Sequence, residues 1–259
     1  MKAIILAAGI GSRLKEYTEN IPKGMIVVKN KTLIERQIDI LNQANINDII
    51  IIKGYKSEKI NYPNVKYFHN DQYRETNMIE SLMCAASEFN DDLIVTYADL
   101  IYTKELLVKL TNASYDISVC VDPEWRDYWI HRYGETETDL ETLTIKNDHI
   151  VEIGSPAFSS IGINYRYIGI IKFSKSIINK MLKIYNNKKR GNENWTKSGN
   201  NFLNGYMTDL LDEMINNQIK INPLMAAKEW LEIDTVSDYN NLLKDIDSKK
   251  IRNYFSGDL

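Results

Sequence analysis

Residues 6–14, with the sequence Leu-Ala-Ala-Gly-Ile-Gly-Ser-Arg-Leu, combine residue types and spacing that suit the binding of a polyphosphate. Gly9 and Gly11 allow backbone N–H groups to approach a ligand closely, and loops of this kind can surround phosphate oxygens. Two cations accompany the loop, because Arg13 lies near its end and Lys23 follows Pro22. We expect this loop to contact phosphates through Leu6, Ala8, Gly9, Ile10, Gly11 and Ser12.

Two other nucleotide-binding motifs do not fit this loop. A dinucleotide-binding loop needs a third glycine where Leu14 stands, and an acidic residue at the end of the second strand, where Lys53-Gly54 occurs. A Walker A loop needs Gly-Lys-Ser/Thr, which the sequence lacks. The remaining alternative is a tight glycine turn without a ligand, which would leave Arg13 and Lys23 as solvated surface charges.

The array Leu-Ala-Ala-Gly-x-Gly-x-Arg-Leu, followed by Pro-Lys, resembles the signature of the nucleotidylyltransferase family that activates sugar phosphates and related phosphoesters. The resemblance implies a fold like that of the nucleotide-diphospho-sugar transferases, in which the glycine loop binds the nucleoside triphosphate. It also implies catalytic roles for two residues: Arg13 contacts the phosphates, and Lys23 steadies the reacting α-phosphate.

The same resemblance points to a magnesium site. Tyr97-Ala98-Asp99 ends a hydrophobic stretch, and Glu232-Ile233-Asp234 lies far downstream. The family holds Mg²⁺ with an aspartate at the first position and another acid near the second, which implies Asp99 and Asp234 as ligands. Two carboxylates suffice for Mg²⁺, which retains waters and binds substrate phosphates. Alternatively, Asp234 caps a helix that begins near Val236.

Residues 68–82 narrow the choice of nucleotide. Their run Phe-His-Asn-Asp-x-Tyr, with Asn77 and Ser81 further on, resembles the base-and-ribose segment of bacterial phosphocholine cytidylyltransferases. Family members that use UTP or dTTP carry Gly-Thr-Ala at this place, and it is absent here, so CTP is favoured. Asn77 and Ser81 are four residues apart and would share a helix face. We expect both, and Ala98, to bind the nucleotide. The alternative is that Ser81 is only a small packing residue.

The phosphorylated acceptor is suggested by two segments. Sugar-phosphate enzymes of the family have Glu-Lys-Pro late in the chain, whereas Glu152-Ile153-Gly154 occurs here. The segment 124–134 resembles the aromatic choline cage of phosphocholine enzymes, and its arginine suits a carboxylate. A zwitterionic amino-acid phosphate would use both features through Arg126, Trp129 and Tyr133. Alternatively, Trp125 and Trp129 are core aromatics.

As a whole, and in the run 73–82 in particular, the chain resembles the CTP:phosphoglutamine cytidylyltransferases that begin capsule phosphoramidate synthesis. This implies transfer of CMP from CTP to a small phosphorylated substrate such as L-glutamine phosphate, with release of pyrophosphate. Phosphocholine and sugar 1-phosphates are the alternative acceptors. A nucleotide sensor on the same fold, which binds CTP without turnover, is the alternative outside the enzymes.

Composition excludes other classes of protein. The 259 residues are 44% hydrophobic and 26% charged, as in folded globular proteins, and the formal net charge is −3. Basic residues are scattered along the chain, which argues against a nucleic-acid partner. No apolar stretch reaches the roughly 20 residues of a membrane span, and the N-terminal run is too short for a signal peptide. We expect a cytoplasmic protein in which Cys84 and Cys120 are buried, reduced thiols.

The first half of the sequence alternates strands and helices. Continuous apolar runs predict buried strands at residues 3–7, 48–53, 65–68 and 93–96, and helical spacing predicts helices at 32–44, with a Thr32 cap, and 77–86. This alternation predicts a doubly wound, Rossmann-like α/β fold with a mostly parallel sheet.

Shorter β-rich pieces follow at residues 117–121, 129–133, 143–145, 149–153 and 167–173, and helices are expected at 176–184, 208–215 and near 236–246. We expect a single domain of residues 1–259 with an inserted β-rich substrate lobe. Residues 1–110 would bind the nucleotide and residues 111–259 the acceptor.

Overall fold

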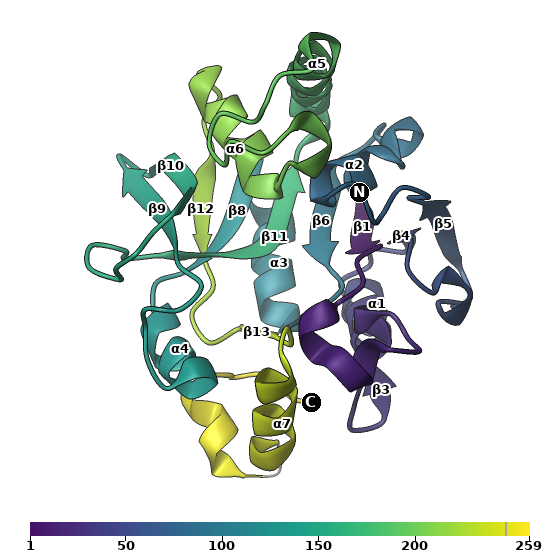
Figure 1. Cartoon of the computed structure of the whole chain (residues 1–259), viewed down its shortest axis with the longest axis vertical. Coiled ribbons are helices and arrows are strands. Elements are labelled where there is room, and N and C mark those ends of the chain that lie inside the picture. Colours follow the sequence, from purple (N-terminus) through teal and green to yellow (C-terminus); the bar gives the residue numbers. More distant parts are fainter. Residues whose placement is uncertain (247) are drawn as a thin grey trace.

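Seven strands form a central sheet in the computed structural model, which describes residues 1–246 and 248–259 (Figure 1). Their order across the sheet is β12-β8-β11-β6-β1-β4-β5. Neighbouring strands are parallel except where β11 pairs with β6 and with β8. The strands are β1 Lys2–Ala7, β4 Asp48–Lys53, β5 Val65–His69, β6 Leu93–Tyr97, β8 Ile117–Asp122, β11 Arg166–Phe173 and β12 Asn222–Met225.

Both faces of this sheet are buried, as β1 illustrates. Ala3 and Ile5 enter one hydrophobic cluster, whereas Ile4 and Leu6 enter another. Because successive side chains of a strand point to opposite faces, a continuous apolar run is what a sheet covered on both sides requires. The predicted mostly parallel α/β sheet is therefore confirmed.

Helices cover the two faces of the sheet. α1 (Leu33–Gln43), α3 (Lys104–Asn112), α4 (Trp125–Tyr133) and α7 (Val236–Asp245) contribute side chains to one cluster. α2 (Met78–Met83), α5 (Lys175–Gly191) and α6 (Met207–Asn216) contribute to the other. The fold is thus doubly wound, with helices on both sides of one sheet.

The first of these helices, α1, begins where the sequence predicted and supports the functional edge of the sheet. Thr32 accepts a hydrogen bond from the Glu35 amide at 3.0 Å, and the Glu35 carboxylate accepts one from the Thr32 amide, which completes a capping box. On the same helix, the Gln37 amide group donates to the carbonyls of Tyr97 and Leu100, each at 2.8 Å. α1 therefore holds the backbone on both sides of Asp99.

A separate hairpin of β9 (Glu141–Lys146) and β10 (His149–Pro156) packs against α6 and extends to the left in Figure 1. Of the expected β-rich pieces, residues 143–145 and 149–153 lie in this hairpin, whereas residues 117–121 and 167–173 belong to the central sheet. Two short strands, β7 (Leu100–Tyr102) and β13 (Trp230–Glu232), pair antiparallel. This pair brings the late part of the chain beside Asp99. Another short pair is β2 (Val27–Val28) with β3 (Lys31–Thr32).

One element differs in type from the prediction. Residues 129–133 were expected to be a strand, but they form the second half of α4, which ends at Gly134 with φ 77°. Trp125 and Trp129 lie four residues apart and both point into the core, as one helix face requires. In addition, α3 and β12 were not predicted from the sequence.

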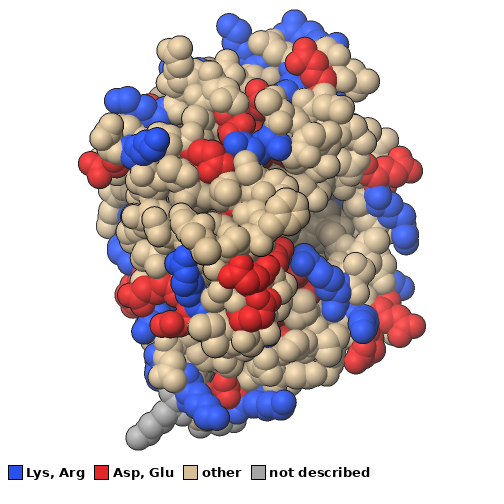
Figure 2. Space-filling model, turned by 60° about the vertical axis from the view of Figure 1, so that its left-hand side comes forward, with Lys and Arg blue, Asp and Glu red and all other residues tan. Residues whose placement is uncertain are grey.

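The exposure of the cysteines and the distribution of surface charge can be compared with the expectations from composition. Cys120 is buried, but Cys84 is only half-buried, which corrects the expectation that both thiols are buried. On the face drawn in Figure 2, acidic and basic side chains are interspersed and form no large field of one sign. Within residues 1–246 and 248–259, no helix is long and apolar enough to cross a membrane.

Candidate active site

The glycine loop lies at the carboxyl end of β1, which is where ligands bind in open α/β sheets. Gly11 adopts φ 69°, and a Cβ there would lie 2.9 Å from Cβ of Lys23. The Gly11 carbonyl accepts hydrogen bonds from the Leu14 amide at 3.0 Å and from the Thr18 hydroxyl at 2.9 Å. Gly9, in contrast, has no atom within 4 Å of the position of a Cβ. Its lack of a side chain leaves space open in a cleft.

That cleft has a volume of about 320 Å³ and lies between the glycine loop and the start of α2. Asn77 is the N-cap of α2 and accepts a hydrogen bond from the Met78 amide, and the Ser81 hydroxyl accepts one from the Asn70 side chain. All of the predicted nucleotide-binding residues except Ile10 line the cleft. Its lining residues are Leu6, Ala7, Ala8, Gly9, Gly11, Ser12, Arg13, Lys23, Gly24, Tyr73, Thr76, Asn77, Met78, Ser81, Tyr97, Ala98, Asp99, Glu232 and Asp234.

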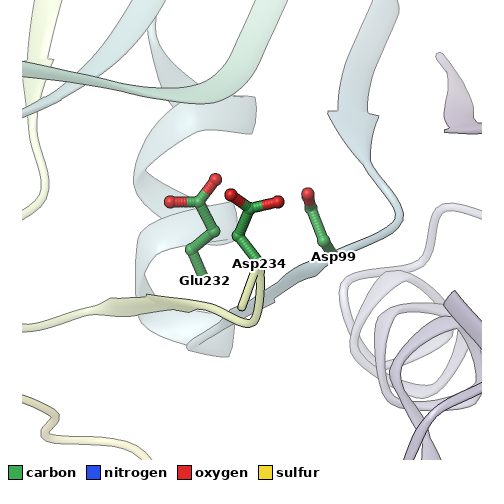
Figure 3. Close-up of side chains that lie close together, drawn as sticks. All are labelled: Asp99, Glu232 and Asp234. Atoms are coloured by element: carbon green, nitrogen blue, oxygen red, sulfur yellow. The ribbon is translucent and has the colours of Figure 1, made fainter. Parts of the chain in front are cut away.

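Three carboxylates among these lining residues lie close together (Figure 3). One oxygen from each of Asp99, Glu232 and Asp234 lies within 4.8 Å of the others. Asp99 follows β6, and the other two acids leave β13 two residues apart, so that both point the same way. The Ile233 amide donates to the Asp99 carbonyl at 3.0 Å, which fixes the two segments together.

These acids fit a hard divalent cation. Mg²⁺ prefers carboxylate oxygens and keeps several waters, so a three-carboxylate cluster open to a cleft meets its needs. Oδ1 of Asp99 is buried and has no hydrogen-bond partner, although buried polar atoms normally have one. A cation would satisfy it. Asp234 does not cap α7, because Thr235 accepts the capping hydrogen bond from the Asp238 amide.

The side chain of Lys23 reaches into this acidic cluster. Its Nζ pairs with Asp99 Oδ2 at 2.5 Å and with Asp234 Oδ1, while Arg13 Nη1 pairs with Asp234 Oδ2 at 2.7 Å. Burial lowers the pKa of Lys23, but the carboxylates of Asp99 and Asp234 outweigh it, so the pKa lies above its usual value. Lys23 is therefore a charged ammonium whose position overlaps that of a cation bound by the same acids.

Arg132 of α4 forms hydrogen bonds that hold Glu232 and Asp238 in position. This buried guanidinium donates to both oxygens of Asp238, at 2.9 and 2.8 Å, and to Glu232 Oε2 at 2.5 Å. Burial raises the pKa of Glu232, but Arg132 and Lys23 offset this and hold the pKa well below its usual range. Asp238 in turn accepts a hydrogen bond from the Asp234 amide at 3.1 Å. Glu232 and the backbone of Asp234 are thus held in place by Arg132 and Asp238, which lie far from each other in the sequence.

A second cleft, of about 420 Å³, adjoins the first. Arg13, Met78, Tyr97 and Glu232 line both clefts, so the two meet beside the acidic cluster. The remaining lining residues come mainly from the hairpin, from β11 and from the start of α6: Asp139, Leu140, Glu141, Gly154, Pro156, Arg166, Tyr167, Ile168, Gly169, Ser198, Tyr206, Met207, Thr208 and Trp230. The arrangement can hold two ligands end to end.

The predicted acceptor residues lie outside both clefts. Trp129 is 0% exposed, and the Arg166 guanidinium lies over its ring at 4.4 Å. Arg126 donates to the Ser160 carbonyl at 2.9 Å, and Tyr133 is half-buried against Trp129. We therefore correct the prediction for Trp129, which is a core aromatic on the inward face of α4. Trp125 is buried in the same way.

Several residues of the site were not predicted. Glu232 was noted in the sequence but not included in the metal site, although its spacing from Asp234 along a strand already placed both acids on one side. Asp139, Glu141 and Arg166 line the second cleft without belonging to any motif. Only the tertiary structure brings the hairpin and β11 beside Arg13.

Comparison with known proteins identifies the family. The profile of the MobA-like NTP transferase domain matches residues 3–231. The chain belongs to this family. It is therefore a nucleotidyltransferase, and the glycine loop and acidic cluster described above lie within the matched segment or directly after it.

Individual relatives carry more specific names. The chain is 35% identical to CTP:phosphoglutamine cytidylyltransferase of Campylobacter jejuni, over 92% of this chain and 97% of that protein. It is 40% identical to choline-phosphate cytidylyltransferase of Streptococcus pneumoniae, over only 44% of this chain and 52% of the relative. A solved structure of CTP:phosphocholine cytidylyltransferase from Streptococcus pneumoniae superposes with a TM-score of 0.76 at 26% identity, covering 94% of this chain and 97% of the other.

Proposed function

We propose that this enzyme transfers the CMP portion of CTP to a small phosphorylated acceptor and releases pyrophosphate. The observation that carries the proposal is the meeting of two clefts beside Arg13 and the three acids, with the glycine loop on one side. CTP occupies the cleft of the glycine loop in this proposal, and the acceptor occupies the second cleft. The names of the relatives support cytidine as the base.

The reaction we propose is a direct in-line displacement. An oxygen of the acceptor phosphate attacks the α-phosphorus of CTP, and the bond to the β-phosphate breaks as pyrophosphate leaves. A substrate phosphate has a second pKa near 6 and is mostly ionised at neutral pH, so no general base is required. Lys23 and Arg13 place positive charge where negative charge develops, which is the main catalytic contribution in phosphoryl-type transfers.

Mg²⁺ is the cofactor we propose for the acidic cluster. Asp99, Glu232 and Asp234 would hold it, and it would neutralise charge on the triphosphate and on the departing pyrophosphate. Lys23 pairs with two of these acids, and in this proposal its ammonium contacts phosphate oxygens of CTP when the metal takes those acids. The triphosphate supplies those oxygens.

L-glutamine phosphate is the acceptor we favour, because a relative that is 35% identical over 92% of this chain is named for phosphoglutamine. The biological role would then be in capsule or surface polysaccharide modification, and we place the reaction in the cytoplasm, where thiols such as Cys84 stay reduced. Residues 1–110 would bind the nucleotide and residues 111–259 the acceptor. Glu232 and Asp234 are exceptions, because they belong to the second segment but line the cleft of the glycine loop. Phosphocholine is the second candidate, because Tyr97, Tyr167 and Trp230 supply aromatic rings to the second cleft.

A pyrophosphate-release screen tests this function. CTP, UTP, dTTP, ATP and GTP would each be combined with phosphoglutamine, phosphocholine, phosphoethanolamine or glucose 1-phosphate, with Mg²⁺ present. We expect release with CTP and phosphoglutamine, at a rate well above that of the other nucleotides. Turnover only with UTP or dTTP and a sugar phosphate would contradict both the nucleotide and the acceptor.

A further inference from the structure

Glu141, the first residue of β9, lines the second cleft with a carboxylate that has no cationic partner. Other acids at this end of the molecule are paired: Asp139 with Arg166, Glu232 with Arg132, and Asp234 with Lys23 and Arg13. Among the residues that the structure describes, none donates a hydrogen bond to the Glu141 side chain or forms an ion pair with it. Glu141 is only partly buried, so its carboxylate, which no described group of the protein pairs with, is free to bind a ligand in the cleft.

The protein compensates the charge of Glu141 only in part. Burial raises its pKa, and Arg166 acts in the opposite direction without coming within ion-pair distance. The hydroxyls of Tyr97 and Tyr167 are hydrogen-bonded to each other at 2.9 Å. Burial also raises the pKa of both tyrosines, so they remain neutral. Glu141 therefore lies near these two tyrosines and the cleft, and its carboxylate forms no ion pair with a described residue of the protein.

A carboxylate beside aromatic rings is suited to a positively charged nitrogen. The carboxylate supplies the opposite charge, and ring faces attract a cation and the apolar groups attached to it. Tyr97, Tyr167 and Trp230 line the cleft together with Glu141, and Tyr206 at 44% exposure lies at its surface. A neutral sugar hydroxyl would leave the charge of Glu141 uncompensated.

The position of the cleft sets the shape of this ligand. Arg13 and Glu232 line both clefts, so an occupant of the second cleft has one end near the site of phosphate transfer. Its other end lies toward the hairpin that carries Glu141. Such a ligand carries a phosphate at one end and a cationic nitrogen at the other.

We infer that Glu141 selects the acceptor by pairing with a cationic nitrogen, so that acceptors are phosphorylated amines or amino acids and not sugar phosphates. This inference rests on the proposed function and deepens it by assigning acceptor specificity to one residue. The α-ammonium of phosphoglutamine and the quaternary ammonium of phosphocholine share the required charge. Glu141 touches the acceptor in this account and does not take part in the transfer of CMP.

The test compares Glu141→Gln with the unchanged enzyme. Steady-state constants would be measured with phosphoglutamine, phosphocholine, phosphoethanolamine and glucose 1-phosphate, and acceptor binding would be measured by calorimetry with a non-hydrolysable CTP analogue present. We expect the KM and Kd of the cationic acceptors to rise at least about tenfold, while kcat at saturation and the KM for CTP change little, because a ground-state contact is lost. The acceptor for which the effect is greatest distinguishes the α-amino acid from the quaternary amine.

Glu152→Gln is the matched control. Glu152 lies on the partner strand of the same hairpin but outside the cleft, where it accepts hydrogen bonds from Ser155 and pairs with Lys197. Its variant should keep the acceptor constants of the unchanged enzyme. Glu141→Ser is a second variant without the charge. It covers the case in which the amide of the glutamine variant forms a new hydrogen bond with the acceptor.

Two outcomes overturn the inference. One is an unchanged KM and Kd for every cationic acceptor in both Glu141 variants, and the other is an equal loss for glucose 1-phosphate. If no acceptor releases pyrophosphate, the proposed function fails, but the calorimetric comparison still decides the role of Glu141. Binding of none of the cationic phosphates to the unchanged enzyme also counts against it.

Discussion

At the scale of single residues, one lysine connects the proposed nucleotide and metal sites. Lys23 pairs with Asp99 and Asp234, two of the acids that we propose as ligands of a divalent cation. Its ammonium and such a cation therefore compete for the same oxygens in the nucleotide-free enzyme. The competition ends when phosphate oxygens become available to Lys23, so CTP and the cation should favour each other's binding.

Replacing Lys23 by methionine should separate these two roles. Turnover is expected to fall on the order of 10²-fold or more, because a preorganised charge near the α-phosphate is lost. In contrast, the affinity of the nucleotide-free protein for Mg²⁺ or Mn²⁺ should rise, because the competing ammonium is gone. Calorimetric titration of the free protein with each metal measures the second effect.

Lys15→Met is the control for this experiment, because Lys15 is an exposed lysine of the same segment. It should leave both turnover and metal binding unchanged. Normal turnover in Lys23→Met would remove Lys23 from catalysis. Metal affinity equal to that of the unchanged enzyme would show that its ammonium does not occupy the metal site.

At the scale of elements, local sequence patterns predicted some of the helices and strands around the site correctly and others incorrectly. The Thr32 cap of α1 and the limits of β4 agree with the prediction, because capping boxes and apolar runs act locally. Residues 129–133 include tryptophan, isoleucine and tyrosine, which are common in strands, so this segment predicts a strand. The segment forms a helix instead, because helical spacing lets Trp125 and Trp129 both pack into the core from one face.

The glycine loop allows a prediction about a single element. Gly9→Ala should weaken CTP binding about tenfold or more, while the thermal midpoint stays within a degree or so. Both effects follow from the same geometry: the added Cβ meets no protein atom within 4 Å but enters the cleft. Binding of CTP can be followed by calorimetry and unfolding by circular dichroism.

Gly11→Ala is the contrasting variant. Its φ of 69° and the Cβ contact of 2.9 Å to Lys23 mean that this substitution strains the loop as well. Its thermal midpoint should therefore fall along with CTP binding. Tight CTP binding by Gly9→Ala would show that the loop does not contact the nucleotide.

At the scale of the whole molecule, the parallel half of the sheet was predictable and the acceptor side was not. Parallel strands bring their carboxyl ends to one edge, so the glycine loop after β1 and Asp99 after β6 were expected at the same edge, and the pairing of β1 with β6 makes them neighbours. Asp234 lies 211 residues after Lys23, and only the resemblance to a family indicated that the two meet. The second cleft combines the hairpin, β11 and α6, and no local pattern encodes those contacts.

The transfer of CMP can be tested most directly by following labelled phosphorus. The enzyme would be incubated with Mg²⁺, phosphoglutamine and CTP that carries the label in either the α- or the γ-phosphate, and the products would be separated. Our account predicts that the α-label joins the acceptor in a cytidine-containing product, while the γ-label leaves as pyrophosphate. Transfer of the γ-label to the acceptor, or α-label found only in free CMP, would contradict it.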